Sequence, residues 1–259
     1  MPFTGSHPIA VLPLKRWFSE TPYFAALVVG SMSPDFGYFS PIDVNTHYSH
    51  TLEGMVVMDW PASVLILILV LAIRKSFCQL LPNPHRDFLS SLCVKPNVSV
   101  KIIFITLFCL LFGALTHVIW DSFTHGLSPI VKQSIWLRKE TELGMPIYRV
   151  IQHTSTLVGG LILLLAYRCA LKKKGYSFWP LFHASECKRY VLWLIIGALS
   201  LGLSFVKNYS RVSSFDEFYN YQVFAFHFVA NSIAIGLGAV ILTLLTWQFF
   251  PFFRRKLEP

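Results

Sequence analysis

Five long apolar stretches constrain the fold of this chain more than any other feature. They cover residues 55–73, 102–120, 147–171, 190–206 and 223–249. Each is long enough to cross a bilayer core of about 30 Å as a helix. The chain is 54% hydrophobic and only 14% charged, whereas a soluble domain carries about 25% charged residues. The sequence therefore predicts an all-α polytopic membrane protein with about five full spans, and it excludes a soluble globular domain.

The first 54 residues predict a different kind of membrane element. Thr4 or Ser6 before Pro8, and Thr21 before Pro22, are typical of helix starts with proline in the first turn. Helices over 8–18 and 22–32 would each be about 15 Å long, half of a span. We expect a re-entrant or half-length hairpin that enters from the outer side and brings the start of its first helix beside the end of its second.

The whole chain is expected to form one integral membrane domain. Its predicted parts are the hairpin and outer loop over 1–54, the five-span bundle over 55–249 and a cytoplasmic tail over 250–259.

The distribution of charge predicts the orientation. The segments 74–101, 168–189 and 250–259 hold fourteen Lys and Arg against three acidic residues. By the positive-inside rule these segments lie in the cytoplasm, with the C-terminus, and the spans cross a cytoplasmic membrane. The net charge of +9 is then a topology signal that requires no nucleic-acid partner.

Ionisable residues collect at the outer ends of the spans in this orientation, where seven of the nine histidines fall. Ionisable groups at membrane depth are costly and mark function by default. The candidate metal ligands are His7, Asp35, His50, His117, Asp121 and His153, with His125 behind them.

The most specific motif is His117-Val-Ile-Trp-Asp121-Ser-Phe-Thr-His125. On a helix all three side chains share one face, and His117 and Asp121, one turn apart, could ligate one cation. His125 would lie about 12 Å from His117 along the helix axis. This separation suits a second metal, a substrate phosphate or a supporting hydrogen bond. Imidazole and carboxylate together favour zinc, and manganese or iron less selectively. The alternative is a polar helix end hydrogen-bonded to loop backbone.

Each of the other candidates has a structural alternative. His7 could be a solvated side chain at a helix start, Asp35 an ordinary Pro-Asp turn, and His153 a packing residue at the start of the third span. His50 is preferred over His47 because it is nearer to the first span.

Supporting roles are predicted for a few further residues. Asp59 precedes Trp60-Pro61, where proline bends the helix, so it could orient a ligating histidine or pair with a basic group as a structural lock. His227 and Asn231 share a helical face and could contact substrate, although a helix–helix hydrogen bond explains them as well. Arg149 could meet a phosphate charge.

The segments Pro2-Phe-Thr-Gly-Ser-His7-Pro, Gly-Ser-Met-Ser-Pro-Asp35-Phe, His50-Thr-Leu-Glu-Gly and His117…Asp121…His125-Gly resemble an uncharacterised bacterial family of polytopic membrane proteins. That family and a neighbouring one usually carry the label membrane-bound metal-dependent hydrolase. The resemblance covers residues 1 to about 156 and implies a metal centre of His and Asp ligands. More distantly, the helical His-x-x-x-Asp pattern is similar to the zinc phospholipase C and single-strand nuclease fold, in which zinc ions cleave phosphodiesters.

The leading functional prediction is metal-dependent hydrolysis at the outer face of the membrane. A phospholipid or a lipid-linked phosphoester is the expected substrate, because a site ringed by span ends is open to lipid. The alternative is a transporter or a metal-binding membrane protein without catalysis. Against transport, the inner halves of the spans are nearly all apolar and no inverted repeat is visible.

Overall fold

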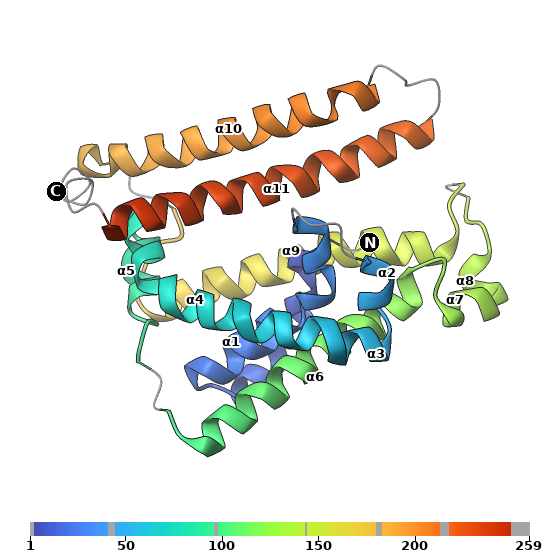
Figure 1. Ribbon diagram of the computed structural model, residues 1–259, viewed down its shortest axis with the longest axis horizontal. Helices are drawn as coiled ribbons and strands as arrows, with labels where there is room; N and C mark the ends of the chain where they lie inside the picture. Colours follow the sequence, from blue (N-terminus) through green and yellow to red (C-terminus); the bar gives the residue numbers. More distant parts are fainter. Residues whose placement is uncertain are drawn as a thin grey trace. The chain divides into compact units, whose positions relative to one another are not determined.

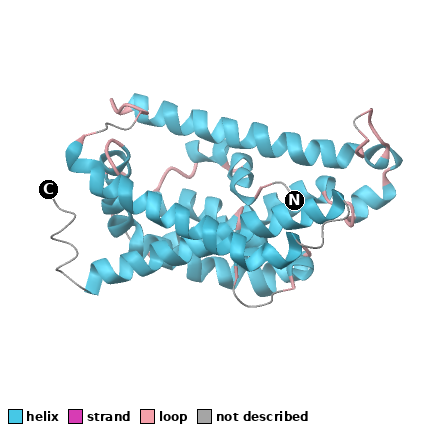
Figure 2. Ribbon diagram, turned by 90° about the horizontal axis from the view of Figure 1, so that it is seen from above, coloured by secondary structure: helices cyan, strands magenta, loops and turns pink. Residues whose placement is uncertain are grey.

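The computed structural model is built of helices joined by loops (Figures 1 and 2). It describes residues 3–40, 45–95, 98–142, 144–179, 183–212 and 218–249. Glu140 and Pro146 form an isolated antiparallel bridge. The predicted tail over 250–259 lies outside the described residues.

Among the described residues, five helical segments are long and apolar enough to cross a membrane, which confirms the predicted fold class. They are Leu52–Leu80, Val100–Gln133, Ile147–Lys173, Cys187–Tyr209 and Phe224–Thr246. The long helices within them are α4 (Trp60–Leu80), α6 (Val100–Thr124), α9 (Ile147–Lys173), α10 (Cys187–Val212) and α11 (Phe218–Phe249). Each matches one of the predicted apolar stretches.

Short helices connect these long ones. They are α2 (Thr46–Ser49), α3 (Leu52–Gly54), α5 (His85–Ser90), α7 (Pro129–Gln133), α8 (Ile135–Arg138) and the 3-10 turn η5 (Ala184–Glu186).

The chain divides into two compact units, and the prediction of a single domain stays a prediction. The first unit comprises residues 1–37, 44–72 and 92–176, and the second comprises 38–43, 73–91 and 177–259. In the second unit α10 and α11 run side by side as an antiparallel pair (Figure 1). There Glu186 pairs with Arg86 at 2.8 Å and with Arg189 at 3.1 Å, which ties η5 to α5 and α10.

The N-terminal hairpin in the first unit combines 3-10 and α-helical segments. The expected first helix consists of two 3-10 segments, η1 (Thr4–Ala10) and η2 (Leu12–Arg16), and the second is α1 (Thr21–Gly30). Pro8 and Pro13 lie in the two 3-10 segments and lack the N–H groups that an α-helix needs there. The tighter turns follow from this loss.

Helices α1 and α6 pack closely through two glycines. A Cβ atom at Gly30 would overlap the carbonyl group of Leu110, and one at Gly113 would lie 2.5 Å from the carbonyl oxygen of Leu27. Leu27 and Leu110 are buried in the same apolar core. This contact fixes the residues that follow α1 against the second half of α6.

The first span begins with a π-helical turn, η4 (Met55–Asp59). The N–H of Trp60 donates to the carbonyl of Met55, five residues back, and Pro61 follows in the first turn of α4. Such turns often occur at functional sites. Asp59 is buried at this point.

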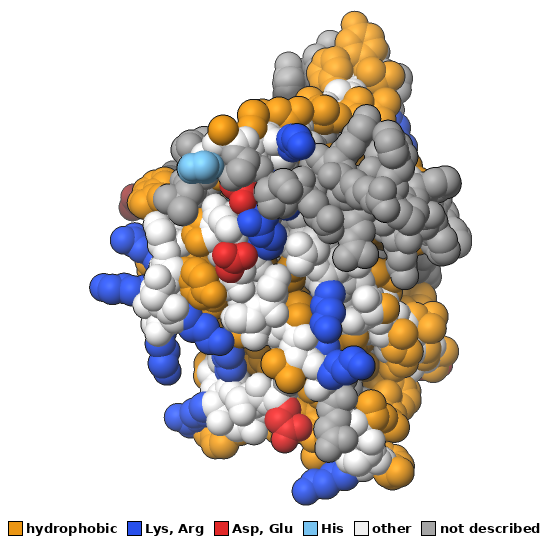
Figure 3. Space-filling model, turned by 90° about the vertical axis from the view of Figure 1, so that its left-hand side faces the viewer, with side chains coloured by type: hydrophobic (Ala, Val, Ile, Leu, Met, Phe, Trp, Pro, Cys, Tyr) orange, Lys and Arg blue, Asp and Glu red, His pale blue; other side chains and the backbone are white. Residues whose placement is uncertain are grey.

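Apolar side chains are exposed along the long helices, as the surface in Figure 3 shows beside its Lys and Arg side chains. Leu65 on α4, Phe104 on α6 and Leu157 on α9 are each about 70% exposed, at 70%, 69% and 74%. Surfaces of this kind suit contact with lipid chains, because large apolar areas are unfavourable when they face water.

Candidate metal centre

Helix α6 carries two of the polar groups of a buried centre in the first unit. His117 and Asp121 lie one turn apart, with 3.2 Å between Nε2 of His117 and Oδ2 of Asp121. Both side chains are buried near the C-terminal end of a 25-residue helix. The predicted shared face of these two residues is therefore present.

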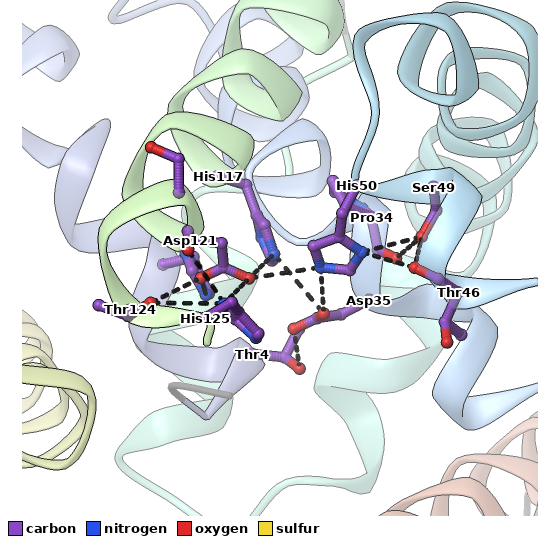
Figure 4. A network of polar contacts seen from close by, with 12 residues as sticks. Thr4, Pro34, Asp35, Thr46, Ser49, His50, His117, Asp121, Thr124 and His125 are labelled. Atoms are coloured by element: carbon purple, nitrogen blue, oxygen red, sulfur yellow. Dashed lines mark hydrogen bonds and ion pairs between the residues drawn. The ribbon is translucent and has the colours of Figure 1, made fainter. Parts of the chain in front are cut away.

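Asp35 and His50 complete the centre from two other segments (Figure 4). Asp35 lies in η3 (Ser33–Phe39), which follows α1, and His50 caps the end of α2. Oδ1 of Asp35 lies 3.3 Å from Nε2 of His50 and 3.5 Å from Nε2 of His117. Nε2 of His50 also lies 3.3 Å from Oδ2 of Asp121.

Backbone carbonyls orient both imidazole rings. Nδ1 of His117 lies 2.8 Å from the carbonyl oxygen of Ser31, and Nδ1 of His50 lies 2.7 Å from that of Thr46. A carbonyl oxygen can only accept, so each Nδ1 carries the proton and donates it. In the neutral ring the lone pair is then on Nε2, which faces the carboxylates. This is the usual arrangement of metal-ligating histidines.

The oxygen of Asp35 that faces away from the histidines is held by a threonine. Oγ1 of Thr4 donates to Oδ2 of Asp35 at 2.6 Å, and Asp35 is completely buried. Oδ1 is therefore left for the centre. The sequence analysis missed this role of Thr4, although the residue stands three positions before His7 in the opening motif.

The atoms that face the centre are buried and have no hydrogen-bond partner. They are Nε2 of His7, His50, His117 and His125, Oδ1 of Asp35 and Oδ2 of Asp121. Buried polar atoms are normally paired, and groups of exceptions point to an ion or another missing partner. One divalent cation would satisfy several of these atoms together.

The distances among four of these atoms fit a small cation. The ligand atoms of Asp35, His50, His117 and Asp121 all lie within 4.8 Å of one another. A tetrahedral zinc site with bonds of about 2.0–2.1 Å has ligand atoms about 3.3–3.4 Å apart, because a tetrahedron's edge is about 1.63 times its centre-to-corner distance. The four N–O distances in the centre run from 3.2 to 3.5 Å. These N–O distances are therefore compatible with a zinc-sized ion.

The buried charges explain the pKa shifts of groups outside the candidate spans. Burial, and next the neighbouring His117, lowers the pKa of His7 to about 3. Burial by itself would lower the pKa of His50, but the neighbouring carboxylates of Asp121 and Asp35 outweigh it and raise the pKa to about 9. Burial opposes ionisation of Asp35, yet contacts with His117 and His50 hold its pKa below the usual range. Two buried carboxylates thus require a positive charge beside them, either a proton or a metal ion.

His7 and His125 adjoin the four-residue centre. The ring of His7 stacks on that of His117, with centroids 3.6 Å apart. His125 was expected on the helical face of His117, but α6 ends at Thr124 and His125 has an extended backbone. Its side chain turns back, so that Nδ1 lies 3.4 Å from Oδ2 of Asp121. Its predicted role as a ligand of a second metal or as a supporting group stays a prediction.

The remaining predicted residues lie elsewhere. The side chains of His153 and His47 are exposed, and Arg149 is half-buried in the first turn of α9. Oδ2 of Asp59 is buried without a hydrogen-bond partner. His227 and Asn231 belong to the second unit, where Asn231 accepts from Lys207 at 3.0 Å. The structure does not bring His153 into the cluster, and its role as a ligand stays a prediction.

These features define a class of protein: an all-helical chain with five candidate membrane spans and a buried Asp–His cluster that could bind a metal. A family model described as "Domain of unknown function (DUF4184)" matches residues 1–248. The chain belongs to this family. No curated protein and no solved structure matches the chain significantly.

Proposed function

We propose that this protein is a metal-dependent hydrolase of lipid or lipid-linked phosphoesters. The observation that carries the proposal is the buried set of Asp35, His50, His117 and Asp121. Two imidazole nitrogens and two carboxylate oxygens suit zinc, and manganese or iron less selectively. A cation held there would lower the pKa of a water molecule and polarise a phosphoryl oxygen.

The protein's own groups would prepare this chemistry. Ser31 and Thr46 fix the two rings through their carbonyls, and Thr4 fixes Asp35. The net reaction adds water across the ester: a P–O bond to the water oxygen forms, the P–O bond to the alcohol breaks, and the alcohol oxygen receives a proton.

The position of the centre favours a lipid substrate. His50 immediately precedes one candidate span, and His117 and Asp121 lie in the last two turns of α6. Nearby in the chain, Ile135 and Trp136 are exposed beside Arg138 and Lys139. Exposed aromatic and basic side chains are typical of the headgroup region. We place this end of the helices on the outer side of a bacterial cytoplasmic membrane, as the charge distribution predicts.

The alternative is metal binding or transport without catalysis. The buried residues of α6 favour hydrolysis over transport, because the polar ones, His117, Asp121 and Thr124, lie at one end. Toward the other end the buried residues are Cys109, Leu110, Gly113 and Ala114. An ion path along α6 would need polar groups there too.

The test combines metal content with hydrolysis. We would purify the full chain in detergent, measure zinc, manganese and iron by elemental mass spectrometry, and assay phosphoesters such as phosphatidic acid and bis(p-nitrophenyl) phosphate. A His117→Ala, Asp121→Ala double variant should lose metal and activity, whereas His47→Ala, which changes an exposed histidine near the centre, should keep both. A wild type that stays metal-free after incubation with each ion would overturn the proposal. Bound metal without hydrolysis of any phosphoester would favour the non-catalytic alternative.

A further inference from the structure

His7 presents a nitrogen atom that the four-residue centre does not use. Its side chain is 3% exposed, and its Nε2 has no hydrogen-bond partner. That atom lies 3.6 Å from Oδ1 of Asp121. This distance is slightly longer than the N–O distances within the centre, which run from 3.2 to 3.5 Å.

Asp121 faces different histidines with its two carboxylate oxygens. Oδ2 faces His117, His50 and His125, at 3.2, 3.3 and 3.4 Å. Oδ1 faces His7 and accepts a hydrogen bond from Oγ1 of Thr124 at 3.5 Å. The rings of His7 and His117 are nearly parallel, with an interplanar angle of 16° and centroids 3.6 Å apart. Two stacked rings therefore direct their Nε2 atoms at the two oxygens of one carboxylate. This is the arrangement expected of a carboxylate that bridges two metal ions.

We propose that a second divalent cation binds between Nε2 of His7 and Oδ1 of Asp121, so that Asp121 bridges a two-metal centre. This inference rests on the first metal site of the proposed function. Two-metal hydrolases hold their ions about 3.5–4 Å apart. Nε2 of His125, whose Nδ1 lies 3.4 Å from Oδ2 of Asp121, is also buried without a hydrogen-bond partner.

The fold holds His7 rigidly in this position. The N–H of Phe3 donates to Oγ1 of Thr156, and Oγ of Ser6 donates to the carbonyl of Thr156, both at 3.0 Å. Gly159 lets this segment approach α9, because a Cβ there would lie 3.1 Å from Cβ of Ser6. The residues that precede His7 are thus anchored to α9.

The net charge of the centre also indicates which ligand would tighten the binding of the second cation. Two dications against the two carboxylates of Asp35 and Asp121 leave an excess of two positive charges. A phosphate group supplies the missing negative charge. The second cation should therefore bind more weakly than the first and tighten when inorganic phosphate is added.

The test counts metal ions in the full chain. His7→Phe keeps a flat ring against His117 but removes the ligand atom, and His47→Phe is the matched control at an exposed histidine. With saturating Mn²⁺ and inorganic phosphate, native mass spectrometry should find two ions per chain in the wild type and the control, and one in His7→Phe. Electron paramagnetic resonance should show a spin-coupled Mn²⁺ pair in the wild type and an isolated Mn²⁺ ion in His7→Phe.

The outcomes separate this inference from the proposed function. One ion per chain in both wild type and His7→Phe would overturn the second site and leave the first intact. Two ions in His7→Phe, or none, would overturn the assignment of His7. No ion in the wild type would overturn both proposals. The resonance spectrum of the wild type tests the bridging role of Asp121 even if His7→Phe fails to fold. Two uncoupled Mn²⁺ ions in the wild type would exclude a bridging Asp121.

Discussion

At the scale of single residues, the centre depends on groups that fix its ligands as much as on the ligands themselves. Nδ1 of His117 and Nδ1 of His50 each donate a hydrogen bond to a backbone carbonyl. Oδ2 of Asp35 accepts a hydrogen bond from Thr4. Each of these three side chains then has one atom free to ligate a cation. These three atoms and one oxygen of Asp121 all lie within 4.8 Å of one another. Such orientation lowers the entropy that metal binding must overcome.

Thr4→Val should weaken metal binding without removing a ligand. The change keeps the shape of the side chain but deletes the hydrogen bond to Oδ2 of Asp35. Losing a partner of this kind costs about 10- to 100-fold in metal affinity. Competition with a fluorescent zinc chelator measures the effect. Thr106→Val is the control, because its hydroxyl bonds only within α6, to Ile102, and an equal loss there would contradict the argument.

At the scale of elements, the centre joins segments that are distant in the chain. Asp35 follows α1, His50 follows α2, and His117 and Asp121 belong to α6. A metal ion bound there would therefore crosslink three segments that the bilayer alone would not hold in register. The close packing of α1 on α6 sets their relative height.

Gly30→Ala should disrupt the centre through the backbone. The added methyl group would overlap the carbonyl of Leu110, and overpacking of this kind costs about 1–3 kcal/mol of the free energy of unfolding. We expect a lower unfolding temperature in detergent and weaker zinc binding, since α1 carries Ser31 and Asp35 at its end. Gly202→Ala on α10, which has open space around it, should leave zinc binding unchanged.

Metal should stabilise the folded chain by mass action. A ligand that binds only the folded state adds about 2.7 kcal/mol at 100 times its dissociation constant. We expect zinc to raise the unfolding temperature of the wild type and a chelator to lower it. The His117→Ala, Asp121→Ala variant should respond to neither, and an equal response there would show that zinc acts elsewhere.

At the scale of the whole molecule, function depends on which side of the membrane the centre faces. By the positive-inside rule, the basic segments predict that the end of α9 lies in the cytoplasm and its start outside. Both ends of this helix offer exposed residues, Glu142 before it and Lys173 within its last turn. They allow the orientation to be measured on one helix.

Single cysteines should report opposite sides. In a chain whose five native cysteines are replaced by serine, Glu142→Cys should react with a membrane-impermeant maleimide in intact spheroplasts. Lys173→Cys should react only after permeabilisation, because we place it in the cytoplasm. The reverse pattern would move the centre to the cytoplasmic side and exclude an outer-face substrate.

Much of the fold could be predicted from periodicity and hydropathy, because these act locally along the chain. The five apolar stretches became five long helices, and the proline spacing located both arms of the hairpin. The i, i+4 pair of His117 and Asp121 was also predictable, since one helical turn fixes it. The extent of α6 was not: His125 caps the helix with an extended backbone, and its predicted role beside His117 and Asp121 stays a prediction.

By itself, the sequence determined the long apolar helices and the helix ends at which most histidines lie. It also named six of the residues that lie in or beside the centre. Only the tertiary structure decided which of these face one point, since His153 and His47 carry the same chemistry but are exposed. It also decided the protonated nitrogens, the pairing of Thr4 with Asp35 and the stacking of His7 on His117. These depend on contacts between segments that are distant in the chain, and no local pattern encodes them. The packing of α1 on α6 and the anchoring of the first turn to α9 supply those contacts.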